Sequence, residues 1–221
     1  MKKKIGLSIL LILVIVGALI LFVPSIREVA EITYLNSVET TEFVVSGDKV
    51  YMNGEINSKT PKQLKEVINN NPEVKTIVML EVPGSLDDEA NIPMAEWVRE
   101  KGLNTYITEN SLIASGGVDF FLAGNKRSME KGAKLGVHSW KDSSGVEAKD
   151  LPKEHIDHEM NRKYIENMLG KDDFYWYTIY AAPANDIYYM NMEEIEKYNI
   201  LTEPIIENPV EEIFEIEPSR W

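Results

Sequence analysis

Alternation between two kinds of periodicity is the feature of this 221-residue chain that most constrains its fold. Apolar runs of strand length recur at 76–80, at 105–108 and up to His138, and segments of helical spacing at about 87–101 and 118–123 separate them. The run 76–80 is apolar almost throughout, which is typical of a strand buried on both faces of a parallel sheet. This order predicts an α/β fold whose parallel sheet is built from βαβ units with right-handed crossovers.

Further elements flank this central part. Thr60-Pro61-Lys62-Gln63 is typical of a helix start, with Thr60 as the cap and Gln63 completing a capping box. The segment 126–132 predicts a hairpin. The other predicted elements are two strands in 43–56 around a Gly47-Asp48 turn, a long helix at about 152–170, a helix through the aromatic run 174–180 and a short helix at 192–198.

The first 24 residues differ from all that follow. Lys2 to Lys4 precede an apolar run from Ile5 to Val23, which as a helix would be ~28 Å long and match the hydrocarbon core of a bilayer. The alternative is a cleaved signal peptide, but the run is long and no good small-x-small cleavage site follows it. We expect a single-pass transmembrane anchor over 1–24, with a cytoplasmic N-terminus and an extracytoplasmic domain. Residues 25–46 would be a linker, 47–202 the main domain and 203–221 an acidic tail.

Charge excludes one class of partner. The chain has 23 basic and 36 acidic residues and a net charge of −13, and without Lys2 to Lys4 the remainder is more acidic still. A nucleic-acid partner requires a basic surface and is therefore not expected. There is no cysteine, which excludes disulfides, cysteine catalysis and thiolate metal sites.

Residues suited to acyl transfer gather where the predicted strands end. Ser115 lies among small residues before the helix at 118–123, and a helix N-terminus presents N–H groups and partial positive charge. His138 closes an apolar run and is a candidate acceptor for the serine proton. The turn 83–85 follows the strand 76–80. Since ligands bind beyond the carboxyl ends of parallel strands, these groups are predicted to share a site. The plain alternative for Ser115 is a helix N-cap.

Three motifs carry a family resemblance. They are the strand and turn at 78–90, Ala114-Ser115-Gly116-Gly117 before the helix, and the segment 132–138 that ends at His138. Together they resemble the ClpP-like superfamily of serine peptidases, with its crotonase-type ββα-repeat fold and parallel sheet, and the likeness spans about 54–202. It is closest to membrane-anchored or periplasmic ClpP-like proteins of bacteria. A weaker likeness lies around Asp186, just before the predicted short helix.

The resemblance implies roles for these residues. Ser115 would be the nucleophile, His138 its base and Asp186 the third member of the triad, with Asp142, Asp150 and Asp172 as rivals for the last role. Gly84, Ser85 and Gly116 would form the oxyanion site. The family has a second glycine where this chain has Ser85, and a serine there costs backbone strain if the position requires a positive φ. The implied function is hydrolysis of a peptide or protein substrate without a cofactor, by a chain that forms a homo-oligomer.

Other interpretations of these segments stay open. Two alternatives to the peptidase are an inactive ClpP-like scaffold that binds membrane or secreted proteins and an acyl-CoA enzyme on the same fold. His155 and His158 could hold a metal, although two histidines on an acidic, solvated helix are the simpler expectation, and we predict no metal site. The aromatic run 174–180 is expected in the core or at an oligomer contact rather than around a substrate.

Overall fold

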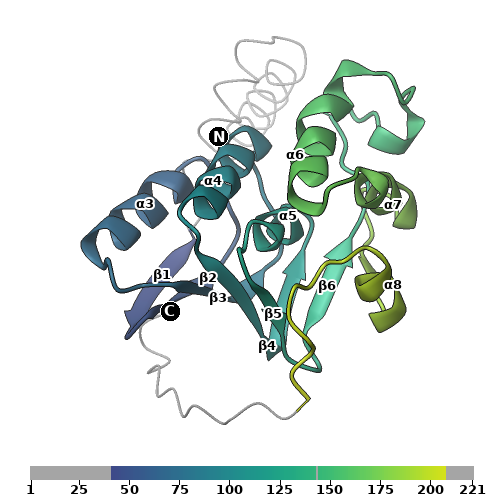
Figure 1. Cartoon of the computed structure of the whole chain (residues 1–221). Helices are drawn as coiled ribbons and strands as arrows, with labels where there is room; N and C mark the ends of the chain where they lie inside the picture. Colours follow the sequence, from purple (N-terminus) through teal and green to yellow (C-terminus); the bar gives the residue numbers. More distant parts are fainter. Residues whose placement is uncertain (1–40, 143, 208–221) are drawn as a thin grey trace, which may run out of the picture. The chain divides into compact units, whose positions relative to one another are not determined.

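One mixed sheet of seven strands organises the part of the chain that the computed structural model describes, residues 41–142 and 144–207. The strands lie in the order β1-β2-β3-β4-β6-β7, with β5 also paired to β4 (Figure 1). Their bounds are β1 Glu42–Ser46, β2 Lys49–Asn53, β3 Thr76–Val82, β4 Asn104–Ala114, β5 Arg127–Met129, β6 Lys134–Val137 and β7 Tyr188–Tyr189.

The centre of the sheet is parallel, as the sequence predicted, and its edges are not. The strands β2, β3, β4 and β6 pair in parallel, whereas β1 with β2 and β6 with β7 are antiparallel. Two predicted elements were wrong in detail. The segment predicted as a hairpin at 126–132 contains β5, which pairs in parallel with β4. The strand predicted at 105–108 continues to Ala114 past an irregularity in its pairing with β3.

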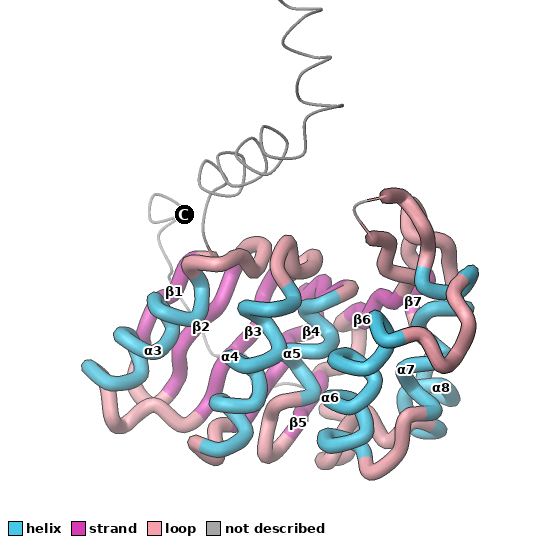
Figure 2. The backbone as a smooth tube through the Cα atoms, turned by 90° about the horizontal axis from the view of Figure 1, so that it is seen from above, coloured by secondary structure: helices cyan, strands magenta, loops and turns pink. Residues whose placement is uncertain are grey.

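Three helices lie side by side along one face of the sheet (Figure 2). They are α3 (Thr60–Asn70), α4 (Asp88–Glu100) and α5 (Gly116–Leu122), and each follows a strand in the chain. Asp87 caps α4, because its carboxylate accepts a hydrogen bond from the Ala90 N–H at 3.0 Å. Beyond His138 come α6 (Glu159–Leu169), α7 (Asp173–Ala181) and α8 (Met192–Lys197), with short 3₁₀ turns at Ala148–Asp150 and Ile156–His158.

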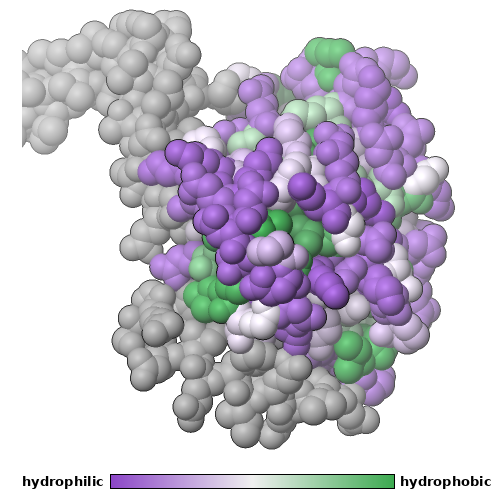
Figure 3. Space-filling view, turned by 60° about the vertical axis from the view of Figure 1, so that its left-hand side comes forward, coloured by the Kyte–Doolittle hydropathy of each residue, from purple (hydrophilic) through white to green (hydrophobic). Residues whose placement is uncertain are grey.

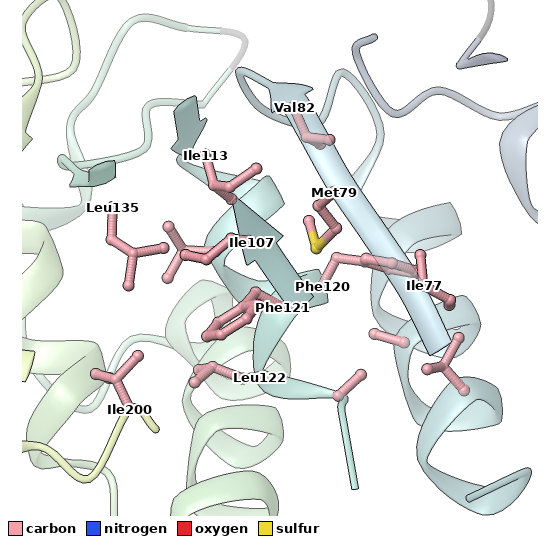
Figure 4. Packing of buried hydrophobic residues seen from close by; sticks show 14 of the residues in the cluster. Ile77, Met79, Val82, Ile107, Ile113, Phe120, Phe121, Leu122, Leu135 and Ile200 are labelled. Atoms are coloured by element: carbon pink, nitrogen blue, oxygen red, sulfur yellow. The ribbon is translucent and has the colours of Figure 1, made fainter. Parts of the chain in front are cut away.

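The core lies between the sheet and the helices that pack on it, and α5 contributes two of its largest side chains. Figure 4 shows Phe120 and Phe121 of α5 against the residues of β3 and β4, with Leu135 and Ile200 beside them. Both phenylalanines are fully buried. Burial of a side chain of this size contributes about 1.5–3 kcal/mol. The helix that follows Ser115 is therefore fixed to the sheet by the largest side chains it carries.

The start of α3 does not match its predicted cap. The structure places Thr60 inside the helix as its first residue, Lys59 at the cap position, and no side-chain bond to the helix N–H groups. The Thr60 hydroxyl instead accepts from the Asn57 N–H at 3.0 Å and pairs with Thr41 at 2.9 Å. Pro61 favours the helix start without a capping box, because its fixed φ suits the first turn.

The first residues of the predicted tail pack on the domain, where Ile206 bridges to Glu130 and Glu207 pairs with Lys131.

The face in Figure 3 is mostly hydrophilic, with apolar residues in small separate patches. Within 41–142 and 144–207, no helix combines the length and hydropathy that a membrane span requires. The predicted anchor, 1–24, lies outside the described residues.

Candidate active site

Three neighbouring parallel strands, β3, β4 and β6, end at one edge of the sheet. The turn 83–85 follows β3, Ser115 follows β4 directly, and His138 follows β6 directly. The register pairs Val82 with Ile113 and Ala114 with Gly136, so the three ends lie at the same height. The local sequence places these groups together because each lies just beyond an apolar strand that the core fixes.

Ser115 has the strained backbone of a sharp strand-to-helix turn. Its φ is 51° and its ψ is −132°, values that a residue with a Cβ rarely adopts. The Ser115 N–H donates to the Gly136 carbonyl at 3.0 Å, and its carbonyl accepts from Val118 at 2.8 Å. Although Ser115 stands at the cap position of α5, its hydroxyl makes no capping bond. Its side chain is therefore not used as a helix cap.

The turn after β3 lies against Ser115. The Ile56 N–H donates to the Gly84 carbonyl at 3.0 Å, and the Leu86 N–H donates to the Ile56 carbonyl at 2.8 Å. In a parallel pairing of this kind the N–H of the intervening residue, Ser85, is directed away from Ile56. The Ser85 nitrogen lies beside the start of α5, 3.1 Å from the position that a Cβ on Gly116 would occupy. The Ser85 and Gly116 N–H groups thus lie beside Ser115, where an oxyanion site requires donors.

Close approach explains the glycines at the start of α5. A Cβ on Gly116 would lie 2.5 Å from the Ser85 Cβ, and a Cβ on Gly117 would lie 2.4 Å from the Val82 carbonyl oxygen. Side chains at either position would push the helix away from the turn. Asn91 of α4, which is fully buried, adds a hydrogen bond from its Nδ2 to the Gly116 carbonyl at 2.8 Å.

The backbone at Ser85 does not have the positive φ that would strain a serine. Within the described residues, only Ser115 and Asn199 among the non-glycine residues have positive φ. Ser85 therefore has backbone angles that a serine adopts without cost. Its hydroxyl accepts from the Asp87 N–H at 3.1 Å, which ties the turn to the start of α4.

His138 and Ser115 line the same pocket, whose volume is about 40 Å³. Burial lowers the pKa of His138, and the negative charges of Glu147 and Asp88 act in the opposite direction. The imidazole is therefore neutral at pH 7, as a proton acceptor must be. Its Nδ1 is buried and has no hydrogen-bond partner among the described residues.

Asp186 does not join this pair. It is exposed, it does not line the pocket, and its carboxylate accepts from the Ile187 N–H at 2.8 Å. Asp142, one of its rivals, is also held elsewhere, since its carboxylate accepts from Ser144 and Val146 within its own loop. The structure thus brings together Ser115, His138, Gly84, Ser85 and Gly116, and it leaves Asp186 outside the pocket.

The pocket contains acids that the sequence analysis did not single out. Asp88 lies in the first turn of α4 and Asp119 in the first turn of α5, and both line the pocket with Ser115. Acids in a first helical turn are common for electrostatic reasons, so their positions in the sequence carried no functional signal. The one available signal was that both helices follow strands that end at the predicted site.

The two histidines of the possible metal motif are arranged differently from the expected solvated helix. His158 is fully buried, its Nδ1 lies 2.6 Å from the Tyr175 hydroxyl, and its ring contacts Trp140 and Trp176. His155 stands at the cap position just before a 3₁₀ turn, and its Nδ1 accepts from the Asp157 N–H. Within the described ranges, no group of three or more His, Cys, Asp or Glu residues is placed to hold a metal ion.

Comparison of this arrangement with solved structures identifies the fold. The 1510-N membrane-bound stomatin-specific protease, in a mutant bound to a substrate peptide, is 16% identical, covers 76% of this chain and 78% of its own, and superposes with a TM-score of 0.53. The ClpP protease catalytic domain from Plasmodium falciparum is 15% identical, covers 82% and 91%, and gives 0.51. No protein-family model matches the chain, and no curated protein does. The chain therefore has the ClpP/crotonase-type fold, in agreement with the resemblance noted from its motifs.

Proposed function

We propose that this protein is a serine peptidase in which Ser115 attacks a peptide carbonyl and His138 accepts its proton. The observation that carries the proposal is the geometry of Ser115. This strained residue at a strand end has a hydroxyl that caps no helix, and it lines a pocket together with a histidine whose pKa is lowered by burial. Backbone strain of about 1–3 kcal/mol is retained in proteins mainly where function requires it.

The proposed reaction proceeds through an acyl-enzyme. The Ser115 Oγ forms a bond to the carbonyl carbon while His138 takes its proton, and the leaving amine then receives that proton. The N–H groups of Ser85 and Gly116 stabilise the oxyanion, and each such donor contributes roughly 3–4 kcal/mol in known enzymes. Water then attacks the acyl group with His138 again as base. Asp186 is absent from this scheme because its carboxylate is exposed and bonded to Ile187.

Covalent labelling of the full chain with a fluorophosphonate tests the proposal. We expect wild type to be labelled and Ser115→Ala to be unlabelled, with Ser144→Ala as the control. Ser144 is an exposed serine of the 142–146 turn, so its loss leaves the pocket intact. Circular dichroism of all three proteins checks the fold. Absence of labelling in wild type would contradict the assignment.

One observation favours a second candidate, the inactive scaffold. The buried Nδ1 of His138 lacks the acid that orients the histidine in a complete triad. A scaffold would leave wild type unlabelled and still bind peptides or proteins through the same pocket. The labelling experiment therefore separates the two candidates.

Location and assembly belong to the same proposal. The run from Ile5 to Val23 and the lysines before it support a membrane anchor with the domain outside the cytoplasm. Full-length protein should then remain in the membrane fraction after a carbonate wash, and a processed soluble form beginning near Ser25 would refute the anchor. We further propose a homo-oligomer, in line with the ClpP-like fold, and a monomer by light scattering at micromolar concentration would refute it.

A further inference from the structure

We propose that the pocket beside Ser115 holds the cationic end of a substrate lysine or arginine, bound by Asp88 and Asp119. The inference rests on the proposed peptidase function, because it names the side chain that the enzyme selects next to the bond it cleaves. Binding of the cation itself does not depend on catalysis, so the two can be tested separately.

The lining of the pocket suits a cation. Asp88 and Asp119 lie in it beside the aromatic rings of Trp140 and Tyr175, and no lysine or arginine of the described chain lines it. Carboxylates bind guanidinium and ammonium groups by charge-assisted hydrogen bonds, and aromatic faces attract the same cations. The helices that carry the two acids, α4 and α5, pack directly on one another. The acids are thus fixed on rigid elements rather than on loops.

Asp119 lacks the partners that a structural acid has. The Asp88 carboxylate accepts from the Asn161 side chain at 3.1 Å. By contrast, the Asp119 carboxyl makes no hydrogen bond and no ion pair with any described residue, and only its backbone carbonyl is engaged, by the Tyr164 hydroxyl at 2.6 Å. Asp119 itself is half-buried and lines the pocket, so a ligand in the pocket can reach its carboxyl. This carboxyl is therefore an acceptor that remains available to a ligand.

Within the part of the chain that the structure describes, no cationic side chain lines the pocket around Asp119. Burial and the neighbouring carboxylate of Asp88 raise the pKa of Asp119 to about 8. Burial raises the pKa values of Tyr164 and Tyr175 and lowers the pKa of His138, so none of these three neighbours is a cation at pH 7. The guanidinium groups of Arg99, Arg127 and Arg162 act on the two tyrosines, but these arginines do not line the pocket. A cation in the pocket would supply the missing charge and favour the ionised form of Asp119. Binding should then release a proton.

The volume of the pocket limits which side chains can enter it. A pocket of about 40 Å³ has room for roughly three water molecules. That is enough for a guanidinium or ammonium group but not for an aromatic side chain. The net charge of −13 favours encounter with a basic peptide.

Isothermal titration of the full-length Ser115→Ala chain tests the pocket without turnover. The probe is methylguanidinium, and N-methylurea, a neutral molecule of similar shape, is its control. We expect millimolar binding of methylguanidinium at pH 8 and none of N-methylurea. Affinity should increase as pH rises from 6 to 9, because Asp119 ionises in that range while the guanidinium stays charged. Asp119→Asn should weaken binding at least tenfold, and Asp48→Asn, at the β1–β2 turn at the opposite end of the strands, should leave it unchanged.

Cleavage of a mixed peptide library by wild type gives the second readout. We expect hydrolysis mainly at lysine or arginine, with that preference lost in Asp119→Asn. Cleavage without this preference, together with equal binding of the two probes, would overturn the cation pocket while leaving the peptidase in place. Binding of methylguanidinium by a protein that cleaves no peptide and is not labelled would support the pocket and refute the peptidase.

Discussion

The two halves of the candidate site are built in different ways. On the nucleophile side, the turn 83–85, Ser115 and the start of α5 are joined by short backbone contacts, and glycine at 116 and 117 is required for the fit. On the base side, His138 has no partner on Nδ1, and the nearby acids come from α4 and from the loop that contains Glu147. The nucleophile side is therefore held by close backbone packing, whereas the imidazole on the base side has no such restraint on Nδ1, so substitutions should affect the two sides differently.

The largest effect is expected on the base side. His138→Ala should slow fluorophosphonate labelling and peptide hydrolysis by on the order of 10³-fold or more, because a serine hydroxyl without a base is a poor nucleophile. His155→Ala is the matched control, since His155 precedes the 3₁₀ turn and does not line the pocket. Equal labelling of wild type and His138→Ala would remove His138 from the mechanism.

A large effect is also expected from Gly116→Ala on the nucleophile side. The added Cβ would lie 2.5 Å from the Ser85 Cβ, so the turn or the helix must move. We expect a stability loss of about 1–3 kcal/mol in urea unfolding. Displacing an oxyanion donor should also slow labelling on the order of 100-fold.

Gly102→Ala is a control that separates a loss of stability from a loss of labelling. Gly102 has a φ of 68° and open space around it, so alanine there strains the backbone without touching the site. It should lower stability by about 1 kcal/mol and leave labelling unchanged. If Gly116→Ala behaved in the same way, the close packing of the turn on α5 would not matter for reactivity.

The pH dependence of labelling should report the burial of His138. Burial lowers the pKa of this imidazole, so the neutral, active form persists below the ordinary value of about 6.5. The labelling rate should therefore fall to half its maximum only at a pH below 6.5. Glu147→Gln removes a charge that raises this pKa and should shift the fall to still lower pH. A rate that halves near pH 7 would show that His138 is not the buried base.

A small effect is expected from Asp186→Asn. Its carboxylate is exposed and accepts only from the Ile187 N–H, so labelling should change by less than about threefold, as expected for a surface residue away from the site. Titration of the labelling rate against probe concentration measures this. A loss on the order of 10³-fold or more would instead require that Asp186 reach His138 in the working enzyme.

The sequence predicted some residues of the site and not others. The strand ends that carry the turn, Ser115 and His138 were predictable, because an apolar strand followed by small or polar residues is a local pattern. The residues that complete the pocket were not. Asp88 and Asp119 meet only because α4 packs on α5, and that contact joins residues about thirty positions apart.

Long-range contacts also explain where the predictions made from local sequence were wrong. Threonine is a residue type that often caps helices. The Thr60 hydroxyl, however, hydrogen-bonds to Thr41 and Asn57, so a tertiary contact replaced the predicted helix cap. The segment at 126–132 has turn residues at both ends, yet β5 pairs with β4 because a neighbouring strand was available. Asp186 was assigned a role from its position just before the predicted short helix, which does not determine where a loop residue points.

The smallest effect is expected from Ser85→Gly, and it tests the nucleophile side most finely. Ser85 does not have positive φ, so glycine relieves no strain there. The substitution removes the hydroxyl that accepts from the Asp87 N–H at 3.1 Å and adds freedom to the unfolded chain. Stability should fall by about 0.5–1 kcal/mol, while labelling stays within about twofold. Ser85→Ala removes the hydroxyl without the added freedom and should cost less. If Ser85→Gly instead accelerated labelling strongly, the turn of the native protein would be held away from its reactive geometry, and the close contact of the turn with α5 would be a restraint on activity.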